Sequence, residues 1–379
     1  RVGMRLDYFV EDSPLGTAGS VLSASAGRER TLVLSGDALT DIDLRKAIEF
    51  HEQHGAAATL ILKEVENPLE YGVVMTDSSG RITRFIEKPE WSLALSDRVN
   101  TGIYILEPRV WEGFAKGSRF DFSMDLFPRL LERGEALYGF VAPGYWCDVG
   151  NLQQYLQAHR DILDGKCKVE LPECVQGCYA EEGATLEHGA KIKGPCYLGA
   201  GCRIQSGASV EAYSVIGRGC VVESGASVRR SVLWQGAAVR QNAELRGAVL
   251  CAKAVIGANA SVFEDSAIGE RTRIGSNASV RAGACVWPEK TIEDACVVSD
   301  ECRFGPYERS IFYGDGICAH PVDLPGELLC RLGRSLAASC GENARICLAT
   351  DGSAPACTAK YALFSGVMEG GADVINAGC

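Results

Sequence analysis

The sequence lacks an excess of positive charge, a long apolar run and a CxxC cysteine pair. Its 379 residues contain 49 Asp and Glu against 38 Lys and Arg, which gives a formal net charge of -11. Binding to a phosphate backbone requires a basic face, so this balance argues against a nucleic-acid partner. No stretch has the apolar length of a membrane span, and the first residues contain no signal-peptide core. We therefore expect no membrane partner and a cytoplasmic location.

The 17 cysteines do not have the spacing of a metal site. Several of them, including Cys196, Cys202 and Cys220, occupy the small-residue position of a repeat. A free cysteine behaves as a small apolar side chain when it is buried. We therefore expect these three thiols to be buried and unpaired.

A six-residue repeat organises the chain between residues 186 and 298. Aliphatic residues recur at this interval, and the first set is Leu186, Ile192, Leu198, Ile204, Val210, Ile216, Val222 and Val228. After two register shifts the six-residue interval resumes from Leu250 to Val298. Six residues suit one short strand and a bend, with the aliphatic side chain pointing inward. The repeat resembles the hexapeptide family, whose fold is a left-handed parallel β-helix with three hexads per coil. We expect roughly six coils.

Upstream of the repeat, apolar strand-like runs alternate with amphipathic segments, which predicts an α/β open sheet. Residues 31–37 form a short apolar run that ends in Asp37, and residues 41–55 have the acidic start and terminal Gly of a helix. Asp148 follows the aromatic-rich run at 144–147. Ligands bind at strand ends in such sheets, and two carboxylates can share a divalent cation. We expect the carboxylates of Asp37 and Asp148 to lie within about 8 Å of each other.

Six pieces of this region occur in the order and spacing of the sugar-phosphate nucleotidyltransferases. They are PLGTAGSV (14–21), LVLSGDALTDIDL (32–44), YGVV (71–74), FIEKP (85–89), NTGIYILEP (100–108) and YWCDVGNLQQYLQAH (145–159). Within that family the region resembles mannose-1-phosphate guanylyltransferases most. The resemblance implies transfer of a nucleotidyl group from a nucleoside triphosphate, with GTP favoured, to a sugar-1-phosphate, with release of pyrophosphate.

The resemblance also assigns roles to individual residues. Asp37 and Asp148 match the family's Mg²⁺ ligands, and Lys88 matches a catalytic residue that binds the sugar phosphate. The positions that match other substrate contacts are Gly16 and Thr17 at the nucleotide base, Gly72 and Glu87 at the sugar, and Asn100 and Thr101 in the sugar-binding turn. Gly allows close backbone approach, Glu accepts from hydroxyl groups, and Lys neutralises phosphate.

The family carries a glycine-rich GxGTR-type loop that wraps the triphosphate, and this sequence starts downstream of it, inside the domain. We therefore expect the chain as given to show little nucleotidyl transfer. The resemblance to proteins with a β-helix also implies a homo-oligomer formed through that element.

The last part of the sequence resembles the first domain of phosphomannomutase. FYGDGI (312–317) matches the opening motif, and residues 345–363 fall where those enzymes carry a phosphoserine loop. Pro355 occupies the phosphoserine position, so we expect no mutase activity; Ser353 as a displaced phosphoserine is the alternative. The expected regions are an incomplete nucleotidyltransferase domain at 1–165, the β-helix at 180–302 and a partial mutase-like domain at 303–379.

Two other functions remain open. A non-catalytic regulatory subunit that binds a nucleotide sugar would share every motif above. A hexapeptide acyltransferase would need a His on the β-helix as a base, and the repeat contains only His188, near its start.

Overall fold

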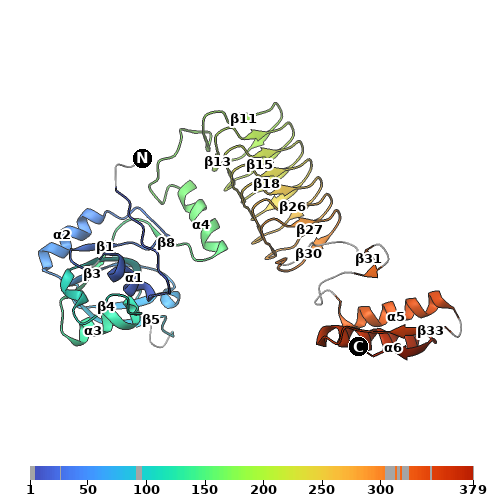
Figure 1. The fold of residues 1–379 in the computed structure, drawn as a ribbon. Coiled ribbons are helices and arrows are strands. Elements are labelled where there is room, and N and C mark those ends of the chain that lie inside the picture. The colour runs from blue at the N-terminus through green and yellow to red at the C-terminus, as the bar shows by residue number, and fades with distance from the viewer. Residues whose placement is uncertain are drawn as a thin grey trace.

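A computed structural model describes residues 5–25, 27–90, 96–303, 312–313, 316–317, 324–341 and 344–378. In the ribbon view an N-terminal α/β unit is followed by helix α4 (Leu152–Leu163), a long β-helix and a small C-terminal unit (Figure 1). The predicted α/β open sheet and left-handed β-helix are both confirmed. No helix in the described part of the chain is long and apolar enough to cross a membrane.

The N-terminal sheet has the strand order β5-β4-β6-β3-β7, with β1 paired to β6. Its strands are β1 (Thr31–Val33), β3 (Ala58–Glu64), β4 (Gly72–Thr76), β5 (Ile82–Glu87), β6 (Arg98–Leu106) and β7 (Leu137–Val141). Only β3 and β7 run parallel, and the other pairs are antiparallel. Leu60, Ile61 and Leu62 of β3 are fully buried, and β3 lies between β6 and β7 in the sheet.

Strand β1 differs from the expectation of a buried strand. Leu32 is 38% exposed and Leu34, just after the strand, is 50% exposed. The reason is that β1 pairs only with β6 among the described strands, so one of its edges has no neighbour. An apolar sequence run predicts a strand but does not say on how many sides the strand is covered.

Helices α1 (Gly16–Ser25), α2 (Leu44–His54) and α3 (Phe127–Glu132) belong to the N-terminal unit, together with the short helices η1 (Pro68–Glu70), η3 (Pro108–Trp111) and η4 (Phe122–Leu126). The predicted end of α2 at Gly55 is confirmed, and the helix begins at Leu44, inside the predicted segment 41–55. The Asp43 side chain accepts from the Arg45 N–H at the start, and Gly55 ends the helix at φ 57°. Asp121 caps η4 by accepting from the Ser123 N–H.

The β-helix is built from three parallel sheets. The first contains β9 (Cys174–Val175), which pairs antiparallel to β10 (Cys178–Ala180), then β13 (Cys196–Leu198), β16 (Val215–Ile216), β19 (Val232–Leu233), β22 (Val249–Leu250), β25 (Ala267–Ile268) and β28 (Cys285–Val286). The second contains β11 (Thr185–Leu186), β14 (Arg203–Ile204), β17 (Val221–Val222), β20 (Ala238–Val239), β23 (Val255–Ile256), β26 (Arg273–Ile274) and β29 (Thr291–Ile292). The third contains β12 (Lys191–Ile192), β15 (Ser209–Val210), β18 (Ser227–Arg229), β21 (Glu244–Arg246), β24 (Ser261–Val262), β27 (Ser279–Val280) and β30 (Val297–Val298).

The repeat residues stack coil on coil, as predicted. Leu186, Ile204 and Val222 lie opposite one another on successive strands of the second sheet. Aliphatic residues from Leu198 to Val228 at the six-residue interval are fully buried, and Cys196, Cys202 and Cys220 are buried free thiols. Leu186 is the exception at 52% exposed, because β11 is the end strand of its sheet and no coil covers its outer side. The second and third sheets have seven strands each, one more coil than expected.

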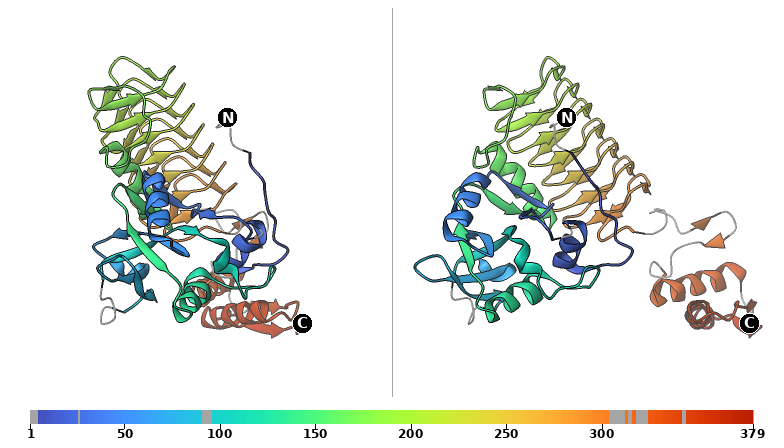
Figure 2. Two further views of the ribbon diagram at one scale, coloured as in Figure 1. Left: turned by 90° about the vertical axis from the view of Figure 1, so that its left-hand side faces the viewer. Right: turned by 60° about the vertical axis from the view of Figure 1, so that its left-hand side comes forward.

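Helix α4 packs on the first sheet of the β-helix. Leu156 on α4 is buried against Val232 and Val249, and the Trp234 indole N–H donates to the Tyr155 hydroxyl at 2.9 Å. On its other side the helix is tied to the N-terminal unit, because the Tyr145 hydroxyl donates to the Asp161 carboxylate at 2.8 Å. The views in Figure 2 also show α4 beside the β-helix. Helix α4 therefore contacts both units.

The C-terminal unit contains α5 (Gly326–Cys340), β33 (Arg345–Leu348), α6 (Ala354–Glu369) and β34 (Asp373–Asn376), and β31 (Phe312–Tyr313) pairs with β32 (Gly316–Ile317) before it. Gly341 ends α5 at φ 89°. Helices α5 and α6 touch at Gly366, where a Cβ atom would lie 1.9 Å from the Cys330 carbonyl oxygen. The resemblance to phosphomannomutase stays a prediction, and residues 314 and 315 of its FYGDGI motif lie outside the described residues.

Candidate functional site

The two aspartates predicted to bind metal lie on neighbouring segments. Asp37 is in the turn between β1 and β2 (Ala38–Thr40), and Asp148 is the last residue of β8 (Trp146–Asp148). Strands β2 and β8 are antiparallel with Ala38 opposite Asp148, and the Val149 N–H donates to the Asp37 carbonyl oxygen at 3.0 Å. The sequence suggested that Asp37 ends a buried strand. In the structure Asp37 instead follows β1 in an exposed turn.

The electrostatics of the pair fit a bound cation. Partial burial, followed by the charge of Asp37, raises the pKa of the Asp148 carboxyl, while Lys88 acts in the opposite direction. The Ser35 hydroxyl donates to Asp37 Oδ1 at 2.5 Å, which fixes the orientation of that carboxylate. A divalent cation between two carboxylates would remove their repulsion.

The described residues contain no group of three or more His, Cys, Asp or Glu side chains arranged to hold a metal ion. A site made of two carboxylates leaves the other coordination positions to water and to substrate oxygens. Mg²⁺ prefers this arrangement, since it keeps several waters and takes one or two carboxylates plus substrate phosphates. The donor set is therefore suited to an ion that is completed by a phosphate ligand.

Strands β4 and β5 bring Gly72, Glu87 and Lys88 together. Gly72 lies opposite Glu87 in the ladder, and a Cβ atom at Gly72 would lie 2.8 Å from the Glu87 carboxylate. The Lys88 N–H donates to the Tyr71 carbonyl oxygen at 3.1 Å, and Lys88 has φ 41°. Glu87 and Lys88 are both exposed. The positive charge of Lys88 lowers the pKa of the Asp148 carboxyl, which opposes the effects of burial and of Asp37.

Asn100 and Thr101 lie on β6, next to the turn that contains Asp37. The Asn100 side chain donates to the Tyr104 hydroxyl at 2.8 Å and accepts from the Gly102 N–H at 3.1 Å. A Cβ atom at Gly102 would lie 3.1 Å from the Cβ atom of Ser35. The Thr101 side chain is buried and donates to the Ile61 carbonyl oxygen at 2.7 Å. Thr101 therefore holds β6 on β3, and Asn100 is the half-buried, more accessible member of the pair.

Gly16 and Thr17 begin helix α1 and are held against η4. Gly16 has φ 73°, and a Cβ atom there would lie 2.6 Å from the Phe120 carbonyl oxygen. The Thr17 hydroxyl donates to Asp121 Oδ2 at 2.7 Å and accepts from the Phe122 N–H at 3.1 Å. Packing within the unit thus accounts for both residue types, independently of any ligand.

Three residues that the sequence did not single out also surround the aspartate pair. Ser35 orients Asp37, and the Tyr71 and Trp146 rings meet edge to face with centroids 5.4 Å apart. Burial, followed by the Asp148 charge, raises the pKa of Tyr71. The aromatic-rich run before Asp148 was the one sequence signal for aromatic rings near the aspartate pair, but it did not show which ring would pack against Trp146.

Two protein families match separate parts of the chain. The nucleotidyl transferase family matches residues 1–165, and the EIF2B subunit epsilon LbH domain matches residues 175–266. A UTP--glucose-1-phosphate uridylyltransferase of Synechocystis is 39% identical over 45% of this chain and 48% of its own length. A mannose-1-phosphate guanylyltransferase of Mycobacterium tuberculosis is 31% identical over 51% of this chain and 54% of its own length. The chain thus spans about half the length of these two relatives.

A longer match extends into the β-helix. The mannose-1-phosphate guanylyltransferase catalytic subunit beta of Danio rerio is 30% identical over 300 residues, which cover 78% of this chain and 79% of that protein. A match over 78% of the chain must include parts of both the N-terminal unit and the repeat. The chain therefore belongs to the nucleotidyl transferase family of sugar-1-phosphate nucleotidyltransferases.

Proposed function

We propose that this protein transfers a nucleotidyl group from GTP to mannose-1-phosphate and releases pyrophosphate, making a GDP-mannose-like nucleotide sugar. The observation that carries the proposal is the pairing of β2 with β8, in which Ala38, the sequence neighbour of Asp37, lies opposite Asp148. The charge of Lys88, which lowers the pKa of Asp148, also supports it. The names of the relatives support the substrate class: two of those described act on mannose-1-phosphate and one on glucose-1-phosphate.

In this proposal each residue type has a physical role. Nucleotidyltransferases of this kind generally use a divalent metal ion, and we propose Mg²⁺ held by Asp37 and Asp148. The ion, when bound, would neutralise charge on the triphosphate. Lys88 would bind the sugar phosphate, whose oxygen attacks the α-phosphorus as pyrophosphate leaves. Gly72, Glu87, Asn100 and Thr101 would form the sugar side of the site, and Gly16 and Thr17 the base side. Catalysis would rest on positioning and charge neutralisation, without a covalent enzyme intermediate.

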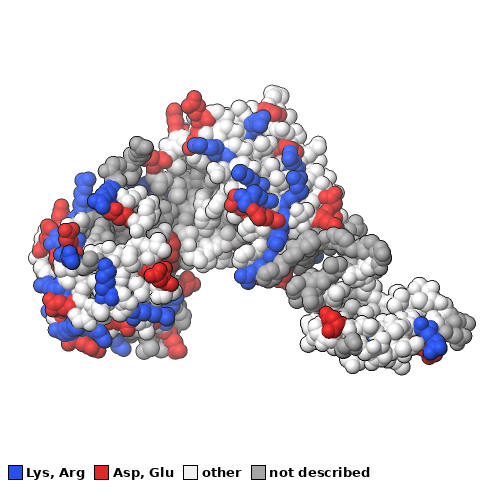
Figure 3. Space-filling view, viewed as in Figure 1, with Lys and Arg blue, Asp and Glu red and all other residues white. Residues whose placement is uncertain are grey.

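We also propose a cytosolic homo-oligomer assembled through the β-helix, and a division of the chain into units at 1–165, 180–302 and 303–379. Large apolar side chains on the surface of the β-helix support an assembly role: Trp287 is 40% exposed and Val297 is 46% exposed. The net charge of -11 and the intermixed acidic and basic side chains on the face of the N-terminal unit seen in Figure 3 favour small-molecule substrates over nucleic acid.

The test is a pyrophosphate-release assay that crosses GTP and UTP with mannose-1-phosphate and glucose-1-phosphate. It is run on this chain and on the chain extended at its N-terminus by a glycine-rich phosphate loop of the family. The proposal predicts the highest rate for GTP with mannose-1-phosphate in the extended chain, and loss of at least about 100-fold in Asp148→Asn.

Asp43→Asn is the matched control, since Asn caps a helix as well as Asp and Asp43 lies at the start of α2. Equal loss in both variants would contradict the assigned role of Asp148. Tight binding of a nucleotide sugar with no turnover in either chain would overturn the enzyme in favour of a regulatory subunit.

A further inference from the structure

Strand β6 is bulged where it passes the turn that contains Asp37. The register of β6 on β3 shifts between Asn100 and Tyr104, so three residues of β6 face one residue of β3. Gly102, the middle one of the three, has φ 75°, which lies in the left-handed region of backbone conformation. Bulges are common beside active sites, where they change the direction of a neighbouring side chain.

Hydrogen bonds to a core side chain hold the bulge in this conformation. The Asn100 side-chain amide donates to the Tyr104 hydroxyl at 2.8 Å, and Asn100 Oδ1 accepts from the Gly102 N–H at 3.1 Å. Tyr104 is buried, and its ring packs against Phe122 and Phe127 with centroids 4.8 and 5.1 Å away. The amide of Asn100 therefore connects the aromatic core to the backbone of the bulge.

The bulge also contacts the residue that orients Asp37. A Cβ atom at Gly102 would lie 3.1 Å from the Cβ atom of Ser35 and 3.6 Å from its hydroxyl oxygen. The ladder between β1 and β6 ends at Val33 opposite Tyr104, so Ser35 lies beyond it. The Ser35 hydroxyl donates to Asp37 Oδ1 at 2.5 Å. Contact with the bulge therefore helps to determine where this donor lies.

We propose that the bulge of β6 positions the Asp37 carboxylate for binding a divalent cation. Ser35, Asn100 and Tyr104 are the positioning residues, and Asn100 acts on the cation site even when no sugar is bound. This inference rests on the proposed function, in which the aspartate pair holds the cation. Hydrogen-bond partners of metal ligands fix the orientation of those ligands, and their loss typically weakens metal binding about 10- to 100-fold.

The test is an Mn²⁺ titration of the full chain by electron paramagnetic resonance, without nucleotide or sugar. Ser35→Ala is expected to weaken Mn²⁺ binding at least about tenfold, because Asp37 loses its donor. Ser35→Thr keeps the hydroxyl and is expected to restore the wild-type affinity. Tyr104→Phe keeps the ring in the core but removes the partner of Asn100, and is expected to weaken binding at least about threefold.

Two variants are matched controls, and both are expected to keep the wild-type affinity for Mn²⁺. Ser79→Ala removes an equivalent bond at the far end of β4 from Gly72, since the Ser79 hydroxyl donates to Asp77 Oδ1 at 2.6 Å. Tyr138→Phe removes a hydroxyl from β7 of the same sheet. Equal weakening in these controls would overturn the proposal, because the effect would not be specific to the bulge.

A double-mutant cycle tests whether Asn100 acts through Ser35. Asn100→Ala is expected to weaken Mn²⁺ binding at least about threefold in the wild-type chain, but less than about twofold in the Ser35→Ala chain. The reason is that the placement of Ser35 no longer matters once its hydroxyl has been removed. Additive losses in the double variant would overturn the proposed connection.

The outcomes separate this inference from the proposed function. Wild-type Mn²⁺ affinity in Ser35→Ala or in Tyr104→Phe, together with weakened binding in Asp148→Asn, would overturn the positioning role alone. Equal Mn²⁺ affinity in the wild-type chain and in Asp148→Asn would overturn the proposed cation site and this inference with it.

Discussion

The burial of the β-helix core predicts very different costs for the same truncation on two strands of one sheet. Ile204 on β14 is fully buried between Leu186 on one side and Val222 on the other. Leu186 on β11 occupies an equivalent position in the repeat but is 52% exposed. The perturbation is truncation of each residue to alanine.

The magnitude follows from the carbon groups removed. Ile204→Ala deletes three buried carbon groups, worth about 2.4 kcal/mol at roughly 0.8 kcal/mol each. The cavity adds to this, because neighbouring coils relax only partly, so we expect a loss of about 3–4 kcal/mol. Leu186→Ala deletes as many carbons, but with 52% of the side chain already in water and no closed cavity the loss should be about 1 kcal/mol.

The assay is urea denaturation followed by far-UV circular dichroism and by tryptophan fluorescence, to which Trp234 and Trp287 of the β-helix contribute. Comparable m-values for the variants would show that the free energies of unfolding can be compared. Ile204→Val is the conservative control, with an expected loss of about 1 kcal/mol. Equal losses for Ile204→Ala and Leu186→Ala would refute the reasoning, because the packing of Ile204 between two coils would then contribute nothing.

Two further predictions concern the N-terminal unit. Thr17→Val should lower its free energy of unfolding by about 1–2 kcal/mol, because the Asp121 carboxylate and the Phe122 N–H both lose a partner. Thr17→Ser should keep the wild-type free energy of unfolding in a urea titration. A Thr17→Val variant of unchanged stability would contradict the structural role of Thr17 and leave ligand contact as its role. Burial lowers the pKa of His51 below its ordinary 6.5, so the unfolded chain binds a proton before the folded chain does, and stability should fall as the pH drops below 6.5. His51→Asn should reduce that slope between pH 7 and 5.5, and an unchanged slope would argue that His51 is not the group responsible.

The elements that local sequence chemistry determines were predictable. The six-residue period gave the β-helix and its buried thiols, since each coil packs only on its neighbours. The acidic start and the terminal Gly of the segment 41–55 indicated helix α2, because both signals act within a turn of the helix. The resemblance, rather than any period, pointed to Asp37 and Asp148, whose adjacency depends on the pairing of two short strands distant in sequence.

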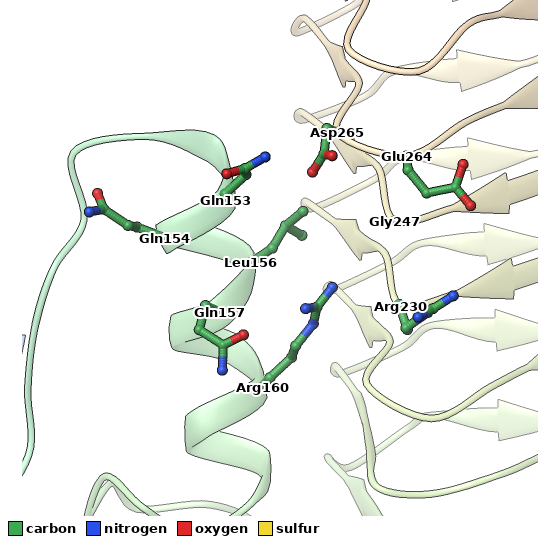
Figure 4. Close-up of a pocket in the computed structure, with 9 residues that line it drawn as sticks. All are labelled: Gln153, Gln154, Leu156, Gln157, Arg160, Arg230, Gly247, Glu264 and Asp265. Carbon is green, nitrogen blue, oxygen red and sulfur yellow. The ribbon is translucent and has the colours of Figure 1, made fainter. Parts of the chain in front are cut away.

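The features that the sequence did not predict arise at the ends of the units and where elements distant in sequence pack together. The repeat pattern is the same at Leu186 and Ile204, although only Ile204 is covered on both sides. Thr101 reads as part of a sugar-binding turn, yet its hydroxyl bonds to Ile61 across the β3–β6 pair. A cavity of about 470 Å³ beside α4 (Figure 4) was not foreseen, since it arises where a helix packs on coil corners far away in the sequence.

The most direct test of the central claim, that Asp37 and Asp148 hold a divalent cation, is an Mn²⁺ titration followed by electron paramagnetic resonance. The account predicts saturable binding of Mn²⁺ at this site, displaced by Mg²⁺. Binding should be at least about tenfold weaker in Asp37→Asn and in Asp148→Asn, and unchanged in Asp43→Asn. Equal Mn²⁺ affinity in the wild-type chain and in both site variants would contradict the account.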